Sequence, residues 1–142
     1  MVRIEIRYQG NLRCEAVHTP SGRALLTDAP VDNHGKGESF SPTDLVATAL
    51  GTCMATTMGI VAQRHGIDLT GLHVSVVKEM VSVPARRIGR LTTVIAMPRD
   101  PGEEARRLLE HTARNCPVHL SLPPEVERPI TFRWGQEAEA RA

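Results

Sequence analysis

The longest uncharged stretch of the sequence runs from Leu45 to Gln63. A helix-start pattern precedes it, with Ser41 as the N-cap, Pro42 at the first helical position and Asp44 three residues after the cap. A helix that is uncharged all round has no face that favours water. The pattern therefore predicts a long helix over this stretch that is covered on every side.

The expected helix ends with Arg64 and His65 in its last turn and Gly66 just beyond, as is typical of helix C-termini. A membrane span is the competing interpretation, because the uncharged run is nearly long enough to cross a bilayer. However, four threonines make the run only mildly hydrophobic, and aromatic anchors and flanking basic clusters are missing from it. We therefore expect a core helix and no membrane as a partner.

Small residues recur every four positions within this helix, at Ala47, Gly51, Ala55 and Gly59. They form a strip along which another helix could approach closely. Because a glycine costs about 1 kcal/mol relative to alanine in a helix interior, close packing is the expected compensation. Cys53 lies off this strip, and its thiol is either a small buried hydrophobic group or a reactive group in a protected pocket.

Alternating apolar and polar residues on both sides of the helix predict short strands rich in Val, Ile and Thr. The expected strands cover residues 2–8, 12–18, 23–27, 72–83, 87–97 and 129–134. The glycine-rich polar segment 28–40 reads as a loop that leads into the long helix.

A second helix is expected to begin at Asp100, which precedes Pro101 and has Glu103 three residues later. Its apolar residues form one stripe and the rest of its surface is charged, so this helix should cover the core from outside. Pro117 ends the pattern, which leaves Cys116 at the C-terminal edge of the helix.

The element order is βββ-α-ββ-α-β, which predicts an α+β fold. Strands that come in hairpin groups favour mainly antiparallel sheets. The length of 142 residues fits one domain over residues 1–142, with a frayed polar tail at 136–142.

The formal net charge is +1, and only 3% of the residues are aromatic. A near-neutral chain with few aromatic rings lacks the basic surface and stacking groups of nucleic-acid-binding proteins. We therefore expect neither nucleic acid nor an anionic membrane surface as a partner.

Three cysteines, Cys14, Cys53 and Cys116, are widely spaced, with no CxxC motif and no Cys/His cluster at zinc spacing. No metal and no cofactor is expected. The first ten residues alternate in polarity, unlike a signal peptide, so a reducing, cytoplasmic location is expected. In such a compartment distant cysteines indicate catalysis or redox sensing more than a structural disulfide.

A helix that needs cover on every side is difficult to bury in a chain of 142 residues whose other helix is amphipathic. One sheet covers one face of the helix, and a second copy of the chain is the simplest source of the remaining cover. The sequence therefore predicts a homodimer.

Two segments, SPTDLVATALGTCM ending near Cys53 and NCPVHLSL around Cys116, together with the element order, resemble the OsmC/Ohr family of osmotically inducible and organic hydroperoxide resistance proteins. The segment TDAPVDN and the residues Lys78 to Met80 are most similar to an OsmC-like branch. The resemblance implies an OsmC-like intertwined homodimer whose sheets enclose the central helices. It also implies two active sites at the subunit interface, with Cys53 as the peroxidatic and Cys116 as the resolving cysteine.

The chain departs from the family pattern at one position. Characterised peroxidase members have a glutamate ten residues before the first cysteine and an arginine from the upstream loop, whereas Thr43 stands at that position here. Asp44 is next to it, but it fits the capping pattern of the helix better. Four arginines are candidates for the positive charge, and the sequence does not choose among them: Arg13, Arg23, Arg86 and Arg87.

The resemblance implies a thiol-dependent peroxidase that acts in oxidative stress defence. In that chemistry a Cys53 thiolate attacks the peroxide to give a sulfenic acid, Cys116 condenses with it to a disulfide, and an external dithiol reduces the pair. Apolar neighbours of Cys53 favour an organic hydroperoxide as substrate. Two alternatives remain: a non-catalytic dimer that binds a small apolar or thiol ligand, and a thiol redox sensor.

Overall fold

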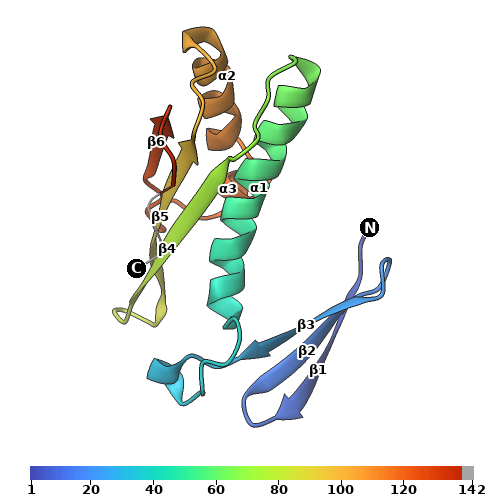
Figure 1. The fold of residues 1–142 in the computed structure, drawn as a ribbon. Helices are drawn as coiled ribbons and strands as arrows, with labels where there is room; N and C mark the ends of the chain where they lie inside the picture. The colour runs from blue at the N-terminus through green and yellow to red at the C-terminus, as the bar shows by residue number, and fades with distance from the viewer. Residues whose placement is uncertain (139–142) are drawn as a thin grey trace. The chain divides into compact units, whose positions relative to one another are not determined.

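The computed structural model describes residues 1–138, and it divides into two compact units, residues 1–46 and the chain from residue 47 onward (Figure 1). In chain order the elements are β1 (Ile4–Gly10), β2 (Arg13–His18), β3 (Arg23–Asp28), the 3-10 turn η1 (Val31–Asn33), α1 (Pro42–Arg64), β4 (His73–Val81), β5 (Arg87–Met97), α2 (Glu103–Arg114), α3 (Pro117–Ser121) and β6 (Ile130–Trp134). This α+β composition agrees with the fold class predicted from the sequence.

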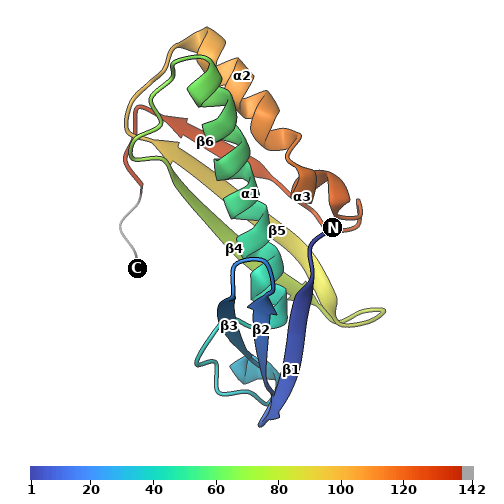
Figure 2. The ribbon, with the colours of Figure 1, turned by 90° about the vertical axis from the view of Figure 1, so that its right-hand side faces the viewer.

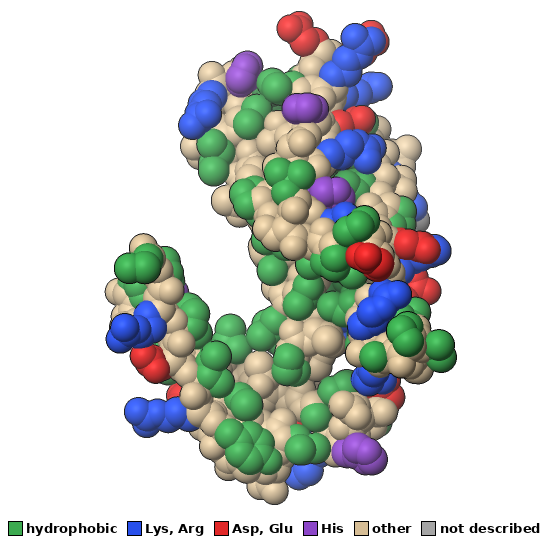
Figure 3. Space-filling model, turned by 180° about the vertical axis from the view of Figure 1, so that it is seen from behind, with side chains coloured by type: hydrophobic (Ala, Val, Ile, Leu, Met, Phe, Trp, Pro, Cys, Tyr) green, Lys and Arg blue, Asp and Glu red, His purple; other side chains and the backbone are tan. Residues whose placement is uncertain are grey.

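The N-terminal unit is an antiparallel sheet in the order β1-β2-β3. Its register places Tyr8 opposite Cys14, and Cys14 opposite Thr27. Many of its large apolar side chains are exposed in the single chain: Ile4, Ile6, Tyr8, Leu12, Leu25 and Leu26. Hydrophobic side chains accordingly show at the surface of this unit in the space-filling view (Figure 3).

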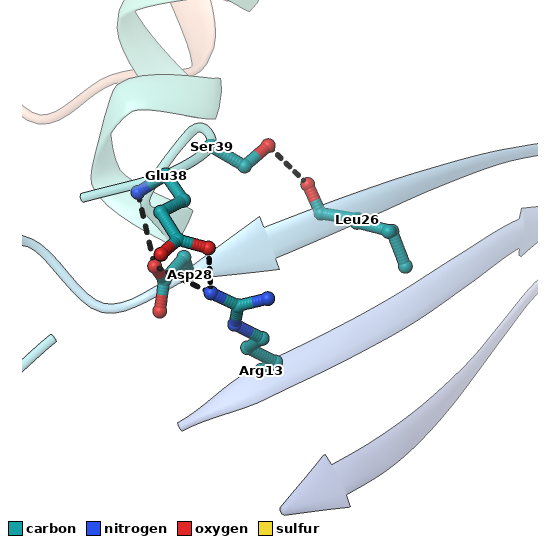
Figure 4. A network of polar contacts seen from close by, with 5 residues as sticks. All are labelled: Arg13, Leu26, Asp28, Glu38 and Ser39. Carbon is teal, nitrogen blue, oxygen red and sulfur yellow. Dashed lines mark hydrogen bonds and ion pairs between the residues drawn. The ribbon is translucent and has the colours of Figure 1, made fainter. Parts of the chain in front are cut away.

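The loop between β3 and α1 is closed at its base by polar contacts (Figure 4). The Asp28 N–H donates to the Phe40 carbonyl over 3.0 Å, and the Glu38 N–H donates to Asp28 Oδ2 over 3.0 Å. Arg13 on β2 pairs with Glu38 and lies 3.7 Å from Asp28 Oδ2. The hydrogen bond to Glu38, followed by its charge, raises the pKa of the Arg13 guanidinium. Two carboxylates and one arginine thus tie the loop to the sheet.

Helix α1 begins and ends where the sequence predicts. The Ser41 N–H donates to Asp44 Oδ2 over 2.8 Å, and the Asp44 N–H donates to Ser41 Oγ over 3.1 Å, which is a reciprocal capping box. At the other end Gly66 adopts a left-handed φ of 66°, which glycine allows without strain. The capping role expected for Asp44 is therefore confirmed.

The C-terminal unit is built on the sheet β4-β5-β6. Strands β4 and β5 are antiparallel, whereas β6 pairs with β5 in parallel. Figures 1 and 2 show α1 and α2 on the same face of this sheet. The core between them includes fully buried side chains from α1, β5 and α2: Leu50, Met54, Met58, Leu91, Ile95, Met97 and Leu109.

At Gly51 the small-residue strip of α1 packs against a strand, whereas the sequence analysis expected a helix there. A Cβ placed on Gly51 would lie 3.0 Å from Val76 Cγ2 and 3.4 Å from Val74 Cγ1. A Cβ on Gly59 would meet nothing within 4 Å. Close packing against β4 therefore accounts for Gly51, because the flat side of the helix lets the strand approach.

One face of α1 is exposed in the single chain, although the sequence predicted cover on every side. This face carries Thr48, Thr52, Thr56 and Ile60. By length and composition α1 would suit a bilayer, a property that core helices of globular proteins share. The exposed face is uncharged, and the Thr52 hydroxyl donates back to the Thr48 carbonyl over 2.7 Å, so its polar group is already satisfied.

Helix α2 starts later than predicted. Gly102, with a φ of 92°, is its N-cap, so Asp100 is not the cap that the sequence analysis expected. The Asp100 Oδ1 instead accepts from the Gly102 N–H over 2.9 Å and from Arg106 Nε over 2.7 Å. The carboxylate is used for a turn and an ion pair, since the glycine already supplies the change of chain direction.

The chain beyond α2 holds a feature that the sequence analysis missed. Pro117 ends α2 as expected, but it also occupies the first turn of the short helix α3. Beyond β6, the Gln136 N–H donates to the Met97 carbonyl over 2.9 Å. Of the tail predicted to fray, residues 139–142 lie outside the described residues.

Candidate functional site

Cys53 lies in the fourth turn of α1, within the C-terminal unit. Its side chain is half-buried, and it sits beside the fully buried Met54. The Thr57 hydroxyl donates to the Cys53 carbonyl over 2.9 Å. The hydroxyl of Thr57 is therefore paired within the helix itself. The helix thus holds a thiol at the border between core and surface.

Cys116 occupies the junction between α2 and α3. Its N–H donates to the Ala113 carbonyl over 3.3 Å at the end of α2, and it is the N-cap of α3. The Cys116 Sγ accepts a hydrogen bond from the His119 N–H over 3.4 Å. The residue is fully buried, with a relative exposure of 0%. The His119 N–H therefore holds the sulfur, and burial keeps it from water.

The Cys53 thiol lies close enough to Cys116 to influence its protonation. Burial raises the pKa of the Cys116 thiol, the hydrogen bond from the His119 N–H opposes this rise, and the Cys53 thiol adds to it through a hydrogen bond and through its charge. Both cysteines are free thiols in the structure. The fold thus brings together the two residues, 63 positions apart, that the resemblance paired.

Two arginines act on the ring of His119, three positions after Cys116. The pKa of the His119 imidazole is lowered by burial first, and then by the charges of Arg128 and Arg114. Arg128 donates to the His119 carbonyl, and over 2.9 Å to the Leu122 carbonyl. Arg114 also lies 5.3 Å over the ring of Phe132. Sequence reasoning passed over His119 and Arg128, although His119 stands within the NCPVHLSL segment that carried the resemblance.

Cys14 belongs to the N-terminal unit. It is half-buried in the middle strand of the sheet, between Tyr8 and Thr27 in the register. Its position suits the structural role that the sequence analysis gave it, as one strand residue among several.

Two of the arginines considered in the sequence analysis have partners in the structure, and one of them pairs with carboxylates. Arg13 pairs with Glu38 and Asp28, as described above, and Arg87 donates to the Ile88 carbonyl over 3.0 Å. Glu38 was not among the carboxylates that sequence reasoning considered, because nothing in its spacing links it to Arg13. Within residues 1–138, no group of three or more His, Cys, Asp or Glu side chains is arranged to hold a metal ion.

Comparison with known proteins identifies the family. Residues 35–128 match the sequence profile of the OsmC-like proteins, a segment that contains both Cys53 and Cys116. The chain belongs to the OsmC-like protein family. No curated protein sequence matches the chain.

Solved structures agree with this OsmC-like assignment. A candidate osmotic stress induced and detoxification response protein from Psychrobacter arcticus 273-4 is 39% identical, with 93% of this chain and 96% of that chain covered and a TM-score of 0.87. The organic hydroperoxide resistance protein OsmC of Legionella pneumophila is 15% identical, with 94% and 96% covered and a TM-score of 0.76. OhrB of Bacillus subtilis, also an organic hydroperoxide resistance protein, is 16% identical, with 94% and 98% covered and a TM-score of 0.64. The last two similarities establish the fold.

Proposed function

We propose that this OsmC-like protein is a thiol-dependent peroxidase that reduces organic hydroperoxides in peroxide stress defence. The observation that carries the proposal is that Cys53 lies near enough to Cys116, inside one compact unit, to raise the pKa of its thiol. Two solved structures with the same fold are named organic hydroperoxide resistance proteins, which supports the same reaction class.

Exposure assigns the roles of the two cysteines in this proposal. Cys53 is half-buried and therefore open to a substrate, whereas Cys116 is fully buried. The raised pKa of Cys116 keeps its thiol protonated, and a negative charge on Cys53 raises that pKa further. Because the thiolate is the nucleophile, Cys53 is the residue that attacks the peroxide and Cys116 is the one that resolves.

The proposed cycle has three balanced steps. The Cys53 thiolate attacks the terminal oxygen of R–O–OH, the O–O bond breaks, and the products are Cys53 sulfenic acid and an alkoxide that takes up a proton to become ROH. Cys116 then attacks the Cys53 sulfur, which forms the disulfide and releases water. An external dithiol reduces the disulfide by exchange and is itself oxidised to a disulfide. The need for a dithiol favours a reducing compartment such as the cytoplasm, which is part of the proposal.

The proposal includes a homodimer. The exposed face of α1 is uncharged, and its three threonines, Thr48, Thr52 and Thr56, follow each other at helical spacing. A second copy of the chain across a twofold axis would cover such a face on both subunits at once. The exposed apolar side chains of the N-terminal sheet, Ile4, Ile6, Leu25 and Leu26, also support a dimer, since exposed apolar patches on single chains usually mark interaction surfaces.

Steady-state turnover tests the proposed function. With cumene hydroperoxide and a dithiol such as dihydrolipoamide, the wild type and the Cys14→Ser control should consume peroxide at equal rates, and Cys53→Ser should lose nearly all activity. Full turnover by Cys53→Ser, or none by the wild type, would overturn the proposal. Binding of the hydroperoxide without turnover would favour the non-catalytic ligand-binding alternative.

A further inference from the structure

Helix α3 is held at both ends by hydrogen bonds that share His119. At the N-terminal end the His119 N–H donates to the sulfur of Cys116, the N-cap residue, over 3.4 Å. At the C-terminal end Arg128 Nη1 donates to the His119 carbonyl and, over 2.9 Å, to the carbonyl of Leu122, the C-cap residue. The residue whose amide reaches the sulfur is therefore also the residue whose carbonyl the arginine holds.

The guanidinium of Arg128 serves the main chain of α3. Arg128 is half-buried, and within residues 1–138 its hydrogen bonds go to these two carbonyls and to no carboxylate. A helix of five residues is not stable by itself, because it makes few internal hydrogen bonds and leaves its last carbonyls without partners. Arg128 supplies those partners and thereby anchors the helix.

The His119 amide matters for Cys116 because a thiolate is the attacking species in disulfide chemistry. Burial raises the pKa of the Cys116 thiol, the hydrogen bond from the His119 N–H lowers it, and Cys53 on α1 raises it. The charges of Arg128 and Arg114 act instead on the His119 imidazole. An effect of Arg128 on the sulfur is therefore transmitted through the main chain of α3.

We propose that Arg128 is a positioning residue for disulfide closure, which holds His119 so that its N–H stays on the Cys116 sulfur and supports the attacking thiolate. This inference rests on the proposed peroxidase cycle. In the closure step Cys116 gives up its proton and its sulfur attacks the sulfur of the Cys53 sulfenic acid, so that the S–S bond forms and the S–O bond breaks. The departing hydroxide takes up the proton and leaves as water. The step needs no oxidant beyond the hydroperoxide.

The test measures how closure depends on pH in single-turnover reactions with cumene hydroperoxide. Dimedone trapping gives the rate of sulfenic acid formation at Cys53, which Arg128→Ala should leave unchanged. Closure, measured by mass spectrometry, should slow by about tenfold at neutral pH, as expected for the loss of one hydrogen bond to a charged group. Because the loss acts on the ionisation of Cys116, the pH profile of closure should move up by about one unit. At high pH the rate should return to the wild-type value.

Two further variants are matched controls. Arg128→Lys keeps the charge and a donor for the carbonyls, so it should recover most of the closure rate. Arg114→Ala removes the other positive charge that acts on the His119 ring, but the Arg114 guanidinium lies 5.3 Å over the Phe132 ring, so closure should keep its wild-type rate. If Arg128→Ala does not fold, Arg128→Gln takes its place with the same expectation.

Closure driven by diamide separates this inference from the proposed function. Cys53 adds to diamide, and Cys116 then displaces the reduced hydrazine as the S–S bond forms, so the reaction with peroxide is bypassed. A wild type that closes with diamide but does not consume cumene hydroperoxide marks failure of the proposed function alone. Wild-type closure kinetics in Arg128→Ala, slowing by the same factor at every pH, or equal slowing in Arg114→Ala would overturn the role of Arg128.

Discussion

At the scale of single residues, the chemistry of the site depends on what burial does to two side chains of opposite kind. Burial raises the pKa of Cys116 and lowers that of His119, and each change disfavours the charged form. Both groups are therefore neutral in the resting protein near pH 7.

Removing the resolving thiol should trap the first intermediate. In Cys116→Ser, Cys53 still meets the hydroperoxide, but its sulfenic acid has no partner thiol within the site. We expect one equivalent of dimedone adduct at Cys53 and a steady-state rate at least about tenfold lower with a dithiol reductant, because intramolecular attack is favoured over intermolecular attack. Intact-protein mass spectrometry measures the adduct. Unchanged turnover would show that Cys116 takes no part in the cycle.

The lowered pKa of His119 predicts a loss of stability in acid. The unfolded imidazole takes up a proton near its ordinary pKa of 6.5, whereas the folded one takes it up only at lower pH. The unfolded state therefore binds more protons in that window, so stability is complete above about pH 6.5 and falls as pH drops through the window. Urea unfolding at a series of pH values should show a shallower acid decline in His119→Gln than in the wild type. A steeper decline in the variant would contradict this assignment.

At the scale of elements, the sequence predicted best where local signals are strong and agree with packing. The capping box at Ser41 and the glycine after α1 set both ends of that helix without help from tertiary structure. The prediction for α2 was wrong at its start, because the N-cap of the helix is Gly102 and Asp100 lies two residues before it. The parallel pairing of β6 is a long-range property, and no spacing in the sequence encodes it.

The candidate site also contains residues that the sequence predicted and residues that it did not. Cys53 and Cys116 were predictable because their flanking segments resemble a family, whereas no residue spacing brings two thiols from distant elements together. His119 and Arg128 escaped notice because a histidine and an arginine on short connecting segments are usually solvated. The burial of the His119 ring nitrogen depends on how α3 is held after α2, where Arg128 donates to the Leu122 carbonyl.

The capping box predicts a measurable share of helix stability. Ser41→Ala removes the hydroxyl that accepts from the Asp44 N–H, and it should lower the free energy of unfolding by about 1 kcal/mol. The control Gln63→Ala, at an exposed position of the same helix, should change it by less than about 0.5 kcal/mol. Urea unfolding measures both variants. Equal effects would mean that the capping box contributes nothing beyond helix propensity.

Two glycines of α1, one in open space and one packed against β4, allow a direct comparison of alanine substitutions. Alanine is favoured over glycine in a helix by about 1 kcal/mol, so Gly59→Ala, with open space at its Cβ, should stabilise the chain by roughly that amount. At Gly51 the new methyl would crowd Val76 at 3.0 Å, which should cancel the gain or reverse it. Thermal unfolding of both variants shows which of the two proteins is more stable. A Gly51→Ala protein more stable than Gly59→Ala would contradict the close packing of α1 on β4.

At the scale of the whole molecule, the uncharged face of α1 predicts association of two chains. A lysine in place of Thr52 would put an unpaired charge into the proposed interface, at a cost of several kcal/mol. Since about 1.4 kcal/mol is a tenfold change in affinity, the dimer should weaken by at least about 100-fold. Sedimentation velocity at micromolar concentration measures this change. Glu104→Lys, on the exposed charged side of α2, is the control that should stay dimeric.

The central claim is that Cys53 and Cys116 form one redox pair, and disulfide mapping tests it most directly. One equivalent of cumene hydroperoxide is added to the fully reduced protein without a reductant, and peptides are mapped by mass spectrometry after free thiols are blocked. The account predicts a single Cys53–Cys116 linkage, with Cys14 recovered as a blocked thiol. A linkage that involves Cys14, or two cysteines that remain reduced while the peroxide persists, would contradict it.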